Sequence, residues 1–299
     1  MGPNPPRVLD YSDHSRSLGK NRYVYAVISR RAGGLSIGLN LNPDKVCNFG
    51  CRYCQVDRKT PAQWTQVDLA RLIEELDRML ALAAGGALWQ TPPFDTVEPR
   101  LRKVADISLA GDGEPTSCRL FADVIEQCGV LRARHGFDSL PVHVLTNATL
   151  FDRPGVRLGL DKLADLGGDI WAKLDAGTAT YFEQVVKTSI PFDHVLANLH
   201  WAASRWPLVI QTLFCRIEGE DPTASEAAAW ALHLRDIVSS GGQIDHVQLT
   251  TVQRRPEDAG CLAVPAGRLE EIADVARAYG LDVRVYPGTW GLEAQQEKP

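Results

Sequence analysis

The chain has 299 residues, of which 44% are hydrophobic and 23% are charged, and this is the composition of an ordinary globular protein. Its length suits one large α/β domain with extensions, or two modest domains. The net charge of −5 argues against broad electrostatic binding to nucleic acid. The sequence has no apolar signal segment and no apolar run of membrane-spanning length, so we expect a cytoplasmic protein that does not insert into membranes.

Segments typical of strands and of helices alternate along the chain. Expected strands cover residues 23–29, 35–41, 105–110, 142–146, 170–175, 208–214, 246–250 and 283–286. Expected helices cover residues 67–82, 121–135, a segment that opens at 152–154, and residues 181–186, 223–238 and 268–279. Such alternation predicts a parallel sheet with helices outside. A partial (β/α)6 TIM-like barrel fits best, although the pattern alone leaves an open doubly wound sheet possible.

We divide the chain into three parts. Residues 1–34 form an N-terminal extension that we expect to be partly disordered, because its start is rich in proline, serine and charge. Residues 35–255 form the barrel. Residues 256–299 form a C-terminal extension of helix and strand that closes the barrel edge.

Three cysteines lie close together at C-x3-C-x2-C spacing, namely Cys47, Cys51 and Cys54. Thiolates suit iron–sulfur clusters and zinc. Structural zinc sites need four protein ligands, and the chain has no second C-x2-C or H-x3-H pair, which disfavours zinc. A [4Fe–4S] cluster normally takes four cysteines, so three would leave one iron with an open coordination position. With seven cysteines in all, a secreted disulfide scaffold is disfavoured.

Other polar residues follow the expected strands. Gly111 and Gly113 would let a ligand approach the backbone, and Glu114 offers an acceptor for an ammonium group, although an ordinary turn is the alternative. Lys173 and Asp175 alternate on one strand, so their side chains share a face and can form an ion pair. A purely structural buried ion pair is an equally good interpretation of these two residues.

The cysteine motif, with Tyr53 directly before its last cysteine, resembles the cluster motif of the radical S-adenosylmethionine (SAM) enzymes. The resemblance implies a partial barrel, a [4Fe–4S] cluster held by the three cysteines, and SAM chelated to the open iron. In that superfamily an electron from the cluster cleaves SAM, and the resulting 5′-deoxyadenosyl radical abstracts hydrogen from the substrate. It also implies an external reductant such as flavodoxin or ferredoxin.

The same resemblance assigns the residues that would contact SAM. The stretch from Gly111 to Glu114 is similar to a Gly-Gly-Glu segment that receives the amino group of SAM, with Asp112 in place of one glycine. Lys173 and Asp175 would reach the carboxylate and ribose of SAM, and Asn147 is a second candidate for the ribose. The resemblance assigns no residue that acts on the substrate.

Within the superfamily the sequence is similar to wyosine-base synthetases of tRNA and their uncharacterised bacterial relatives. Those tRNA enzymes hold a second cluster with cysteines upstream of the motif, whereas residues 1–46 contain no cysteine here, and the chain is acidic. We therefore expect a small-molecule or peptide substrate. An RNA base, a glycyl-radical enzyme activated by this protein, and a non-catalytic iron–sulfur protein are the alternatives.

Overall fold

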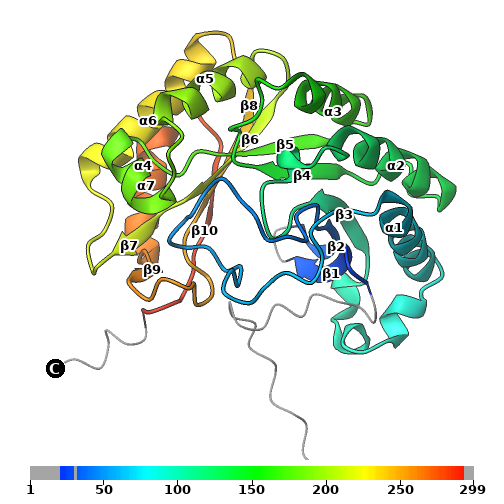
Figure 1. The fold of residues 1–299 in the computed structure, drawn as a ribbon. Coiled ribbons are helices and arrows are strands. Elements are labelled where there is room, and N and C mark those ends of the chain that lie inside the picture. The colour runs from blue at the N-terminus through cyan, green and yellow to red at the C-terminus, as the bar shows by residue number, and fades with distance from the viewer. Residues whose placement is uncertain (1–20, 30–31, 293–299) are drawn as a thin grey trace, which may run out of the picture.

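The computed structural model describes residues 21–29 and 32–292, so the part of the N-terminal extension before residue 21 lies outside the described residues. The strands and helices form an arc of parallel strands with helices on its outer side (Figure 1). The strands are β1 (Val24–Ser29), β2 (Gly34–Leu39), β3 (Val104–Leu109), β4 (Val142–Thr146), β5 (Asp169–Lys173), β6 (Leu208–Leu213), β7 (Cys215–Ile217), β8 (Ile244–Thr250), β9 (Cys261–Ala263) and β10 (Val283–Tyr286). The helices are α1 (Leu69–Ala84), α2 (Phe121–Arg134), α3 (Pro154–Asp165), α4 (Ala179–Val186), α5 (Phe192–Ala203), α6 (Ala224–Ser239) and α7 (Ala266–Arg277).

The main sheet has the strand order β1-β2-β3-β4-β5-β6-β8-β10, which follows the chain without reversal. A doubly wound sheet would reverse its order at a switch point, so this possibility is excluded. Strands β2 to β6, β8 and β10 are parallel, and β1 pairs antiparallel with β2 at one edge. No pairing between the described residues joins β1 to β10, so the barrel is open. The predicted partial barrel is confirmed, with β10 as a seventh parallel strand at the other edge.

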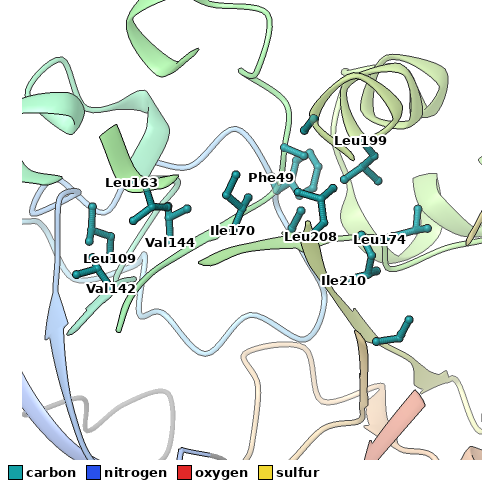
Figure 2. Close-up of a cluster of buried hydrophobic side chains, with 14 of the residues drawn as sticks. Phe49, Leu109, Val142, Val144, Leu163, Ile170, Leu174, Leu199, Leu208 and Ile210 are labelled. Carbon is teal, nitrogen blue, oxygen red and sulfur yellow. The ribbon is translucent and has the colours of Figure 1, made fainter. Parts of the chain in front are cut away.

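The hydrophobic core lies between the sheet and the outer helices (Figure 2). Every second residue of each strand points outwards into it, as the pleat of a strand requires. Val142 and Val144 of β4, for example, are fully buried, and Leu163 of α3 is also fully buried in this core. Helix α1 contributes Leu72, Leu76, Met79, Leu80 and Ala83 from a single apolar face.

Several helices begin where the sequence provides a capping side chain. Asp68 accepts a hydrogen bond from the Arg71 amide before α1, and Thr178 and Thr223 cap α4 and α6 in the same way. Short 3₁₀ helices lie between α1 and β3 and after β3, at Ala87–Gln90, Phe94–Thr96, Pro99–Leu101 and Pro115–Ser117. Among the described residues, no helix has both the length and the apolar character needed to cross a membrane.

A small antiparallel ribbon of β7 and β9 lies beside the main sheet. It was not predicted, because each strand has only three residues and so lacks a periodic signal. The loop that follows β2, drawn in blue in Figure 1, crosses the concave side of the arc towards this ribbon. That loop contains the three clustered cysteines. The proposed division of the chain at residues 34 and 255 stays a prediction.

Candidate functional site

The cysteine loop, defined here as residues 45–59, places three free thiols on the concave side of the sheet. Cys47, Cys51 and Cys54 are each half-buried. Burial raises the pKa of the Cys51 thiol to about 12, and the nearby charge of Lys173 opposes this shift. Burial also raises the pKa of Cys47. Among the described residues, no group of three His, Cys, Asp or Glu side chains converges as a site for a single metal ion.

Neutral hydrogen bonds fasten the cysteine loop to the end of β4. The side chain of Asn48 makes two hydrogen bonds: its Nδ2 donates to Thr149 Oγ1 at 2.7 Å, and its Oδ1 accepts from Asn147 Nδ2 at 2.6 Å. The Gly50 amide donates to the Val186 carbonyl at the end of α4, at 3.0 Å. A side chain on Gly50 would lie 3.1 Å from the Lys187 carbonyl oxygen, so the close approach of the loop to α4 favours glycine there.

A second set of contacts fastens the loop to residues 254–260, which we call the latch segment. Arg52 Nε lies 2.6 Å from Asp258 Oδ2 in a charge-assisted hydrogen bond. The Glu257 amide donates to the Cys54 carbonyl at 3.3 Å, and Gln55 Nε2 donates to the carbonyl of Arg254 at 3.1 Å. Burial raises the pKa of Asp258, but the hydrogen bond from Arg52 outweighs it together with smaller contributions, so the net pKa is lowered.

The turn after β3 packs tightly against the end of β2. A side chain on Gly111 would lie 2.3 Å from Asn40 Oδ1, and one on Gly113 would lie 2.2 Å from the Val46 carbonyl, so both positions require glycine. Asp112 fits between them because Asn40 binds it twice. Asn40 Nδ2 donates to Asp112 Oδ2 at 2.7 Å, and the Asp112 amide donates to Asn40 Oδ1 at 3.1 Å. The departure from a Gly-Gly-Glu sequence therefore has a local structural explanation.

Glu114 is buried, with 3% of its surface exposed, and its carboxylate already accepts four hydrogen bonds. The donors are the Thr116 amide (3.1 Å), Thr116 Oγ1 (2.6 Å), Thr146 Oγ1 (2.7 Å) and the Asn147 amide (2.7 Å). Burial raises the pKa of Glu114, while these hydrogen bonds oppose the shift. Three of these hydrogen bonds end on Oε1 and one ends on Oε2, and together they join the turn after β3 to the end of β4. The contact of Glu114 with an ammonium group stays a prediction.

Asn147 has a similar linking position. It is 3% exposed, and its Oδ1 accepts from the amide and the hydroxyl of Thr149, at 3.2 and 2.7 Å. Its Nδ2 donates to Asn48 of the cysteine loop. A ribose contact for Asn147 stays a prediction, and the hydrogen bonds of its side chain within the protein make it a support for the loop.

Lys173 and Asp175 form the ion pair that their alternation predicted. Lys173 Nζ lies 3.2 Å from Asp175 Oδ2, and the Leu213 amide donates to Asp175 Oδ1 at 2.8 Å. Tyr53 of the cysteine loop donates its hydroxyl to the same carboxylate, and Lys173 Nζ lies 4.9 Å from the centre of its ring. Burial raises the pKa of Tyr53, so the phenol is neutral. The predicted residues from the ends of β3, β4 and β5 therefore converge on the cysteine loop.

A row of polar side chains continues along the concave face of the sheet. Lys173, Gln211, Gln248 and Arg284 are direct neighbours in the register of β5, β6, β8 and β10. Gln211 Nε2 donates to Gln248 Oε1 at 3.4 Å, and both amides are largely buried. This row places hydrogen-bonding groups, rather than an apolar layer, beside the Lys173 and Asp175 pair.

Sequence reasoning missed the residues that hold the site in place. Asn40 follows directly after β2, and an asparagine at a strand end is a weak signal that could have been noticed. Arg52 lies inside the cysteine motif, but its partner Asp258 is 206 residues away, and no local pattern connects them. Asn48 also lies inside the cysteine motif, and nothing in the sequence indicates its contacts with Asn147 and Thr149.

No family model matches the chain. A protein named GTPase Obg from Brachyspira hyodysenteriae is 27% identical over 198 residues, which are 65% of this chain and 25% of that protein. UPF0026 protein MJ1312 from Methanocaldococcus jannaschii is 28% identical over 141 residues, 45% of this chain and 36% of that protein. The matches thus span only about a quarter to a third of these relatives. The sequence of this chain contains no G-x-x-x-x-G-K-[S/T] phosphate-binding motif.

Solved structures give a more extensive match, at 14% sequence identity in each case. A radical SAM methyltransferase from Sphaerobacter thermophilus matches with a TM-score of 0.62, over 91% of this chain and 71% of that one. Streptococcus suis SuiB bound to S-adenosylmethionine matches with a TM-score of 0.52, over 86% and 48% of the two chains. Native anSMEcpe with bound AdoMet matches with a TM-score of 0.50, over 84% and 63%. The chain has the fold of the radical SAM enzymes.

Proposed function

We propose that the protein is a radical SAM enzyme whose [4Fe–4S] cluster is held by Cys47, Cys51 and Cys54. The observation that carries this proposal is the position of three free thiols in one loop on the concave side of a radical SAM fold. The donor set fits the cluster, because iron–sulfur clusters are held by cysteine thiolates and three ligands leave one iron open. When bound, the cluster would supply the electron that cleaves SAM to a hydrogen-abstracting 5′-deoxyadenosyl radical.

The chain's own residues would bind and orient SAM. Main-chain carbonyl groups of the turn at residues 111–113 can accept hydrogen bonds from the SAM ammonium. Glu114 holds that turn through its buried contacts and adds negative charge near the ammonium. Lys173 and Asp175 lie next to Tyr53 of the cysteine loop, where a cation and a carboxylate can bind the carboxylate and ribose hydroxyls of SAM.

We further propose a small polar molecule or a peptide as substrate. The row of Lys173, Gln211, Gln248 and Arg284 supports a hydrogen-bonding substrate beside the proposed SAM site. Conversion of a tRNA base by a second cluster is disfavoured, since residues 1–46 have no cysteine. Of the later cysteines, Cys215 and Cys261 are buried together in the β7–β9 ribbon, and Cys128 is buried on α2.

The proposal is tested by anaerobic reconstitution with iron and sulfide. We expect about four irons per chain, as a cuboidal cluster requires. Dithionite and SAM should then yield 5′-deoxyadenosine. A variant with alanine at Cys47, Cys51 and Cys54 should bind no cluster, whereas Cys128→Ser, which changes a buried thiol of α2, should retain it. Full iron retention in the triple variant, or no SAM cleavage by the loaded protein, would refute the proposal.

The substrate class needs a separate test. Incubation with N1-methylguanosine-containing tRNA, pyruvate, SAM and reductant should leave the tRNA unchanged. Formation of a tricyclic base, or iron content near two clusters per chain, would overturn this prediction.

A further inference from the structure

The turn after β4, residues 146–149, contains a strained residue. Ala148 has a φ of 61°, in the left-handed region that residues other than glycine rarely adopt. Both of its neighbours reach the cysteine loop, because Asn147 Nδ2 donates to Asn48 Oδ1 and Asn48 Nδ2 donates to Thr149 Oγ1. Strain of this kind persists only where the surrounding structure holds it, and it is concentrated at functional sites. The contacts that hold Ala148 therefore also fix how the turn meets the cysteine loop.

Helix α5 holds this turn by two main-chain carbonyl groups. Asn198 Nδ2 donates to the carbonyl of Ala148 at 2.8 Å, and His194 Nε2 lies 2.9 Å from the carbonyl of Thr149. A carbonyl oxygen can only accept, so Nε2 of His194 carries the hydrogen in this contact. The two side chains lie four residues apart and project from one face of α5. Because Ala148 is fully buried and Asn198 is 7% exposed, loss of the Asn198 amide would leave this carbonyl buried without its donor.

The support from α5 complements the support from Glu114. The Glu114 carboxylate accepts hydrogen bonds from the hydroxyl of Thr146 and the amide of Asn147, in the first half of the turn. Helix α5 binds the second half, at residues 148 and 149. Within the turn, the Ala148 amide donates to Thr146 Oγ1 at 3.1 Å. The turn is thus held from two sides, and the left-handed residue lies between the two supports.

We infer that Asn198 is a positioning residue for the cysteine loop and acts through the left-handed turn. Its amide fixes Ala148, the side chains on either side of Ala148 bind Asn48, and Asn48 directly follows Cys47. Without that amide the Ala148 carbonyl loses a buried donor, and the turn can relax out of the left-handed region. The inference rests on the proposed function in one respect, since Cys47 is a cluster ligand in that proposal.

Amide hydrogen exchange of the cluster-free protein tests the inference without any cofactor. The variant is Asn198→Leu, which keeps a similar volume and removes the donor. We expect the amides of residues 147–149 to exchange about tenfold faster, and those of residues 48–50 severalfold faster, because both segments open locally. The control is Ile272→Val, which removes one methylene from a fully buried side chain of α7. Compared at equal loss of stability in urea, the control should leave these amides unchanged.

A second substitution in the turn separates positioning from simple packing of α5. Glycine adopts the left-handed region without strain, so Ala148→Gly in the Asn198→Leu background should bring the exchange of residues 48–50 back to within about threefold of the wild type. Packing lost on α5 would not be restored by a change in the turn. If Asn198→Leu does not fold, His194→Ala removes the other, half-buried contact and should speed the same amides about threefold.

Iron release adds a readout on the reconstituted protein. Anaerobic transfer of iron to a chelator should be severalfold faster from Asn198→Leu than from the wild type, and Ala148→Gly should slow it again. Unchanged exchange of residues 48–50, equal acceleration in the Ile272→Val control, failure of the glycine to restore protection, or unchanged iron release would each overturn the inference. If the wild type binds no cluster, the proposed function fails, whereas the exchange data still decide whether Asn198 positions the cysteine loop.

Discussion

The two sides of the cysteine loop are fastened by different chemistry. On the β4 side the contacts are mostly neutral, and the exposed Asn48 bonds there to the buried Asn147 and Thr149, with the buried Glu114 carboxylate beneath them. On the latch side the main contact is the ion pair of Arg52 with Asp258, whose side chains are 15% and 25% exposed. Buried networks lose stability sharply when one member is removed, whereas partly exposed ion pairs respond to salt and pH. We therefore expect the β4 side, called the inner side below, to hold the cysteine loop rigidly. We expect the attachment to the latch segment, called the outer side, to change with salt and pH.

The largest effect is expected from Glu114→Ala on the inner side. This change leaves the buried donors of Thr116, Thr146 and Asn147 without their acceptor, at a cost of about 3 kcal/mol in the free energy of unfolding. The measurement is urea denaturation of the cluster-free protein. Glu126→Ala, which removes an exposed carboxylate on α2, is the control and should change stability by less than about 0.5 kcal/mol.

The same Glu114 variant should bind SAM about ten- to a hundredfold more weakly, because both the turn at 111–113 and the nearby negative charge are lost. The perturbation of the reduced cluster's electron resonance signal by added SAM reports this binding. If SAM perturbs the variant at wild-type concentrations, Glu114 has only a structural role.

On the outer side, Arg52→Asp and Asp258→Arg should each loosen the cysteine loop. Each single change places two side chains of the same charge next to each other. It also removes a charge-assisted hydrogen bond, which costs about 1.5 kcal/mol of stability. Amide hydrogen exchange of residues 47–55 in the cluster-free protein should then be about tenfold faster. The double variant restores opposite charges and should recover most of the protection.

Additive effects of the two changes on the exchange rate would contradict this prediction. If the double variant exchanges as fast as the sum of the single effects predicts, the two side chains do not interact in solution. High salt should narrow the difference between the wild type and the single variants, because partly exposed charges are screened.

A smaller effect is expected from Tyr53→Phe, which removes one donor to Asp175 and keeps the ring under Lys173. Asp175 retains its contacts with Lys173 and the Leu213 amide, so the loss should be about 1 kcal/mol in unfolding free energy. Differential scanning calorimetry of the cluster-free protein measures it, with Tyr279→Phe, at an exposed position in the turn after α7, as the matched control. If the Tyr53→Phe protein is as stable as the control, the hydrogen bond from Tyr53 to Asp175 does not contribute to stability.

The sequence predicted the barrel because most strands and helices of ordinary length leave strong periodic signals, although the twelve-residue helix α5 was not predicted. The β7–β9 ribbon left no such signal, since a strand of three residues is too short to show a repeated alternation of polar and apolar side chains. Cys47, Cys51 and Cys54 were predicted as cluster ligands because the spacing of the motif is local, and this assignment stays a prediction. The burial of Glu114 was not predicted, because its partners Thr146 and Asn147 follow some thirty residues later in the chain. Only the folded chain shows which hydrogen bonds a strand-end side chain makes.

The smallest predicted effect is the change with pH in the stability that the Arg52–Asp258 ion pair provides. Burial raises the pKa of Asp258, but the hydrogen bonds from Arg52 and the Gly260 amide and the charges of Arg52 and Lys187 together outweigh it, so the pKa is lowered in the folded protein. A carboxyl group with a lowered folded pKa stabilises the protein above its unfolded pKa, about 3.9, and loses that contribution as pH falls through the folded value. The latch should therefore be fully formed from about pH 5 to 8 and weaken only below about pH 4.

The comparison of wild type with Asp258→Asn isolates this response. At pH 6 the wild type should be more stable in urea by up to about 1 kcal/mol, the usual range for a partly exposed ion pair. The difference should shrink as the pH falls towards the folded pKa and vanish below it, because Asp258 is then protonated in both the folded and the unfolded protein and resembles asparagine. A difference that persists undiminished in acid would mean that the substituted amide disturbs packing rather than charge. Equal stability at pH 6 would mean that the Arg52–Asp258 ion pair contributes nothing, and the hydrogen bonds of Cys54 and Gln55 would then be the contacts that fasten the loop to the latch segment.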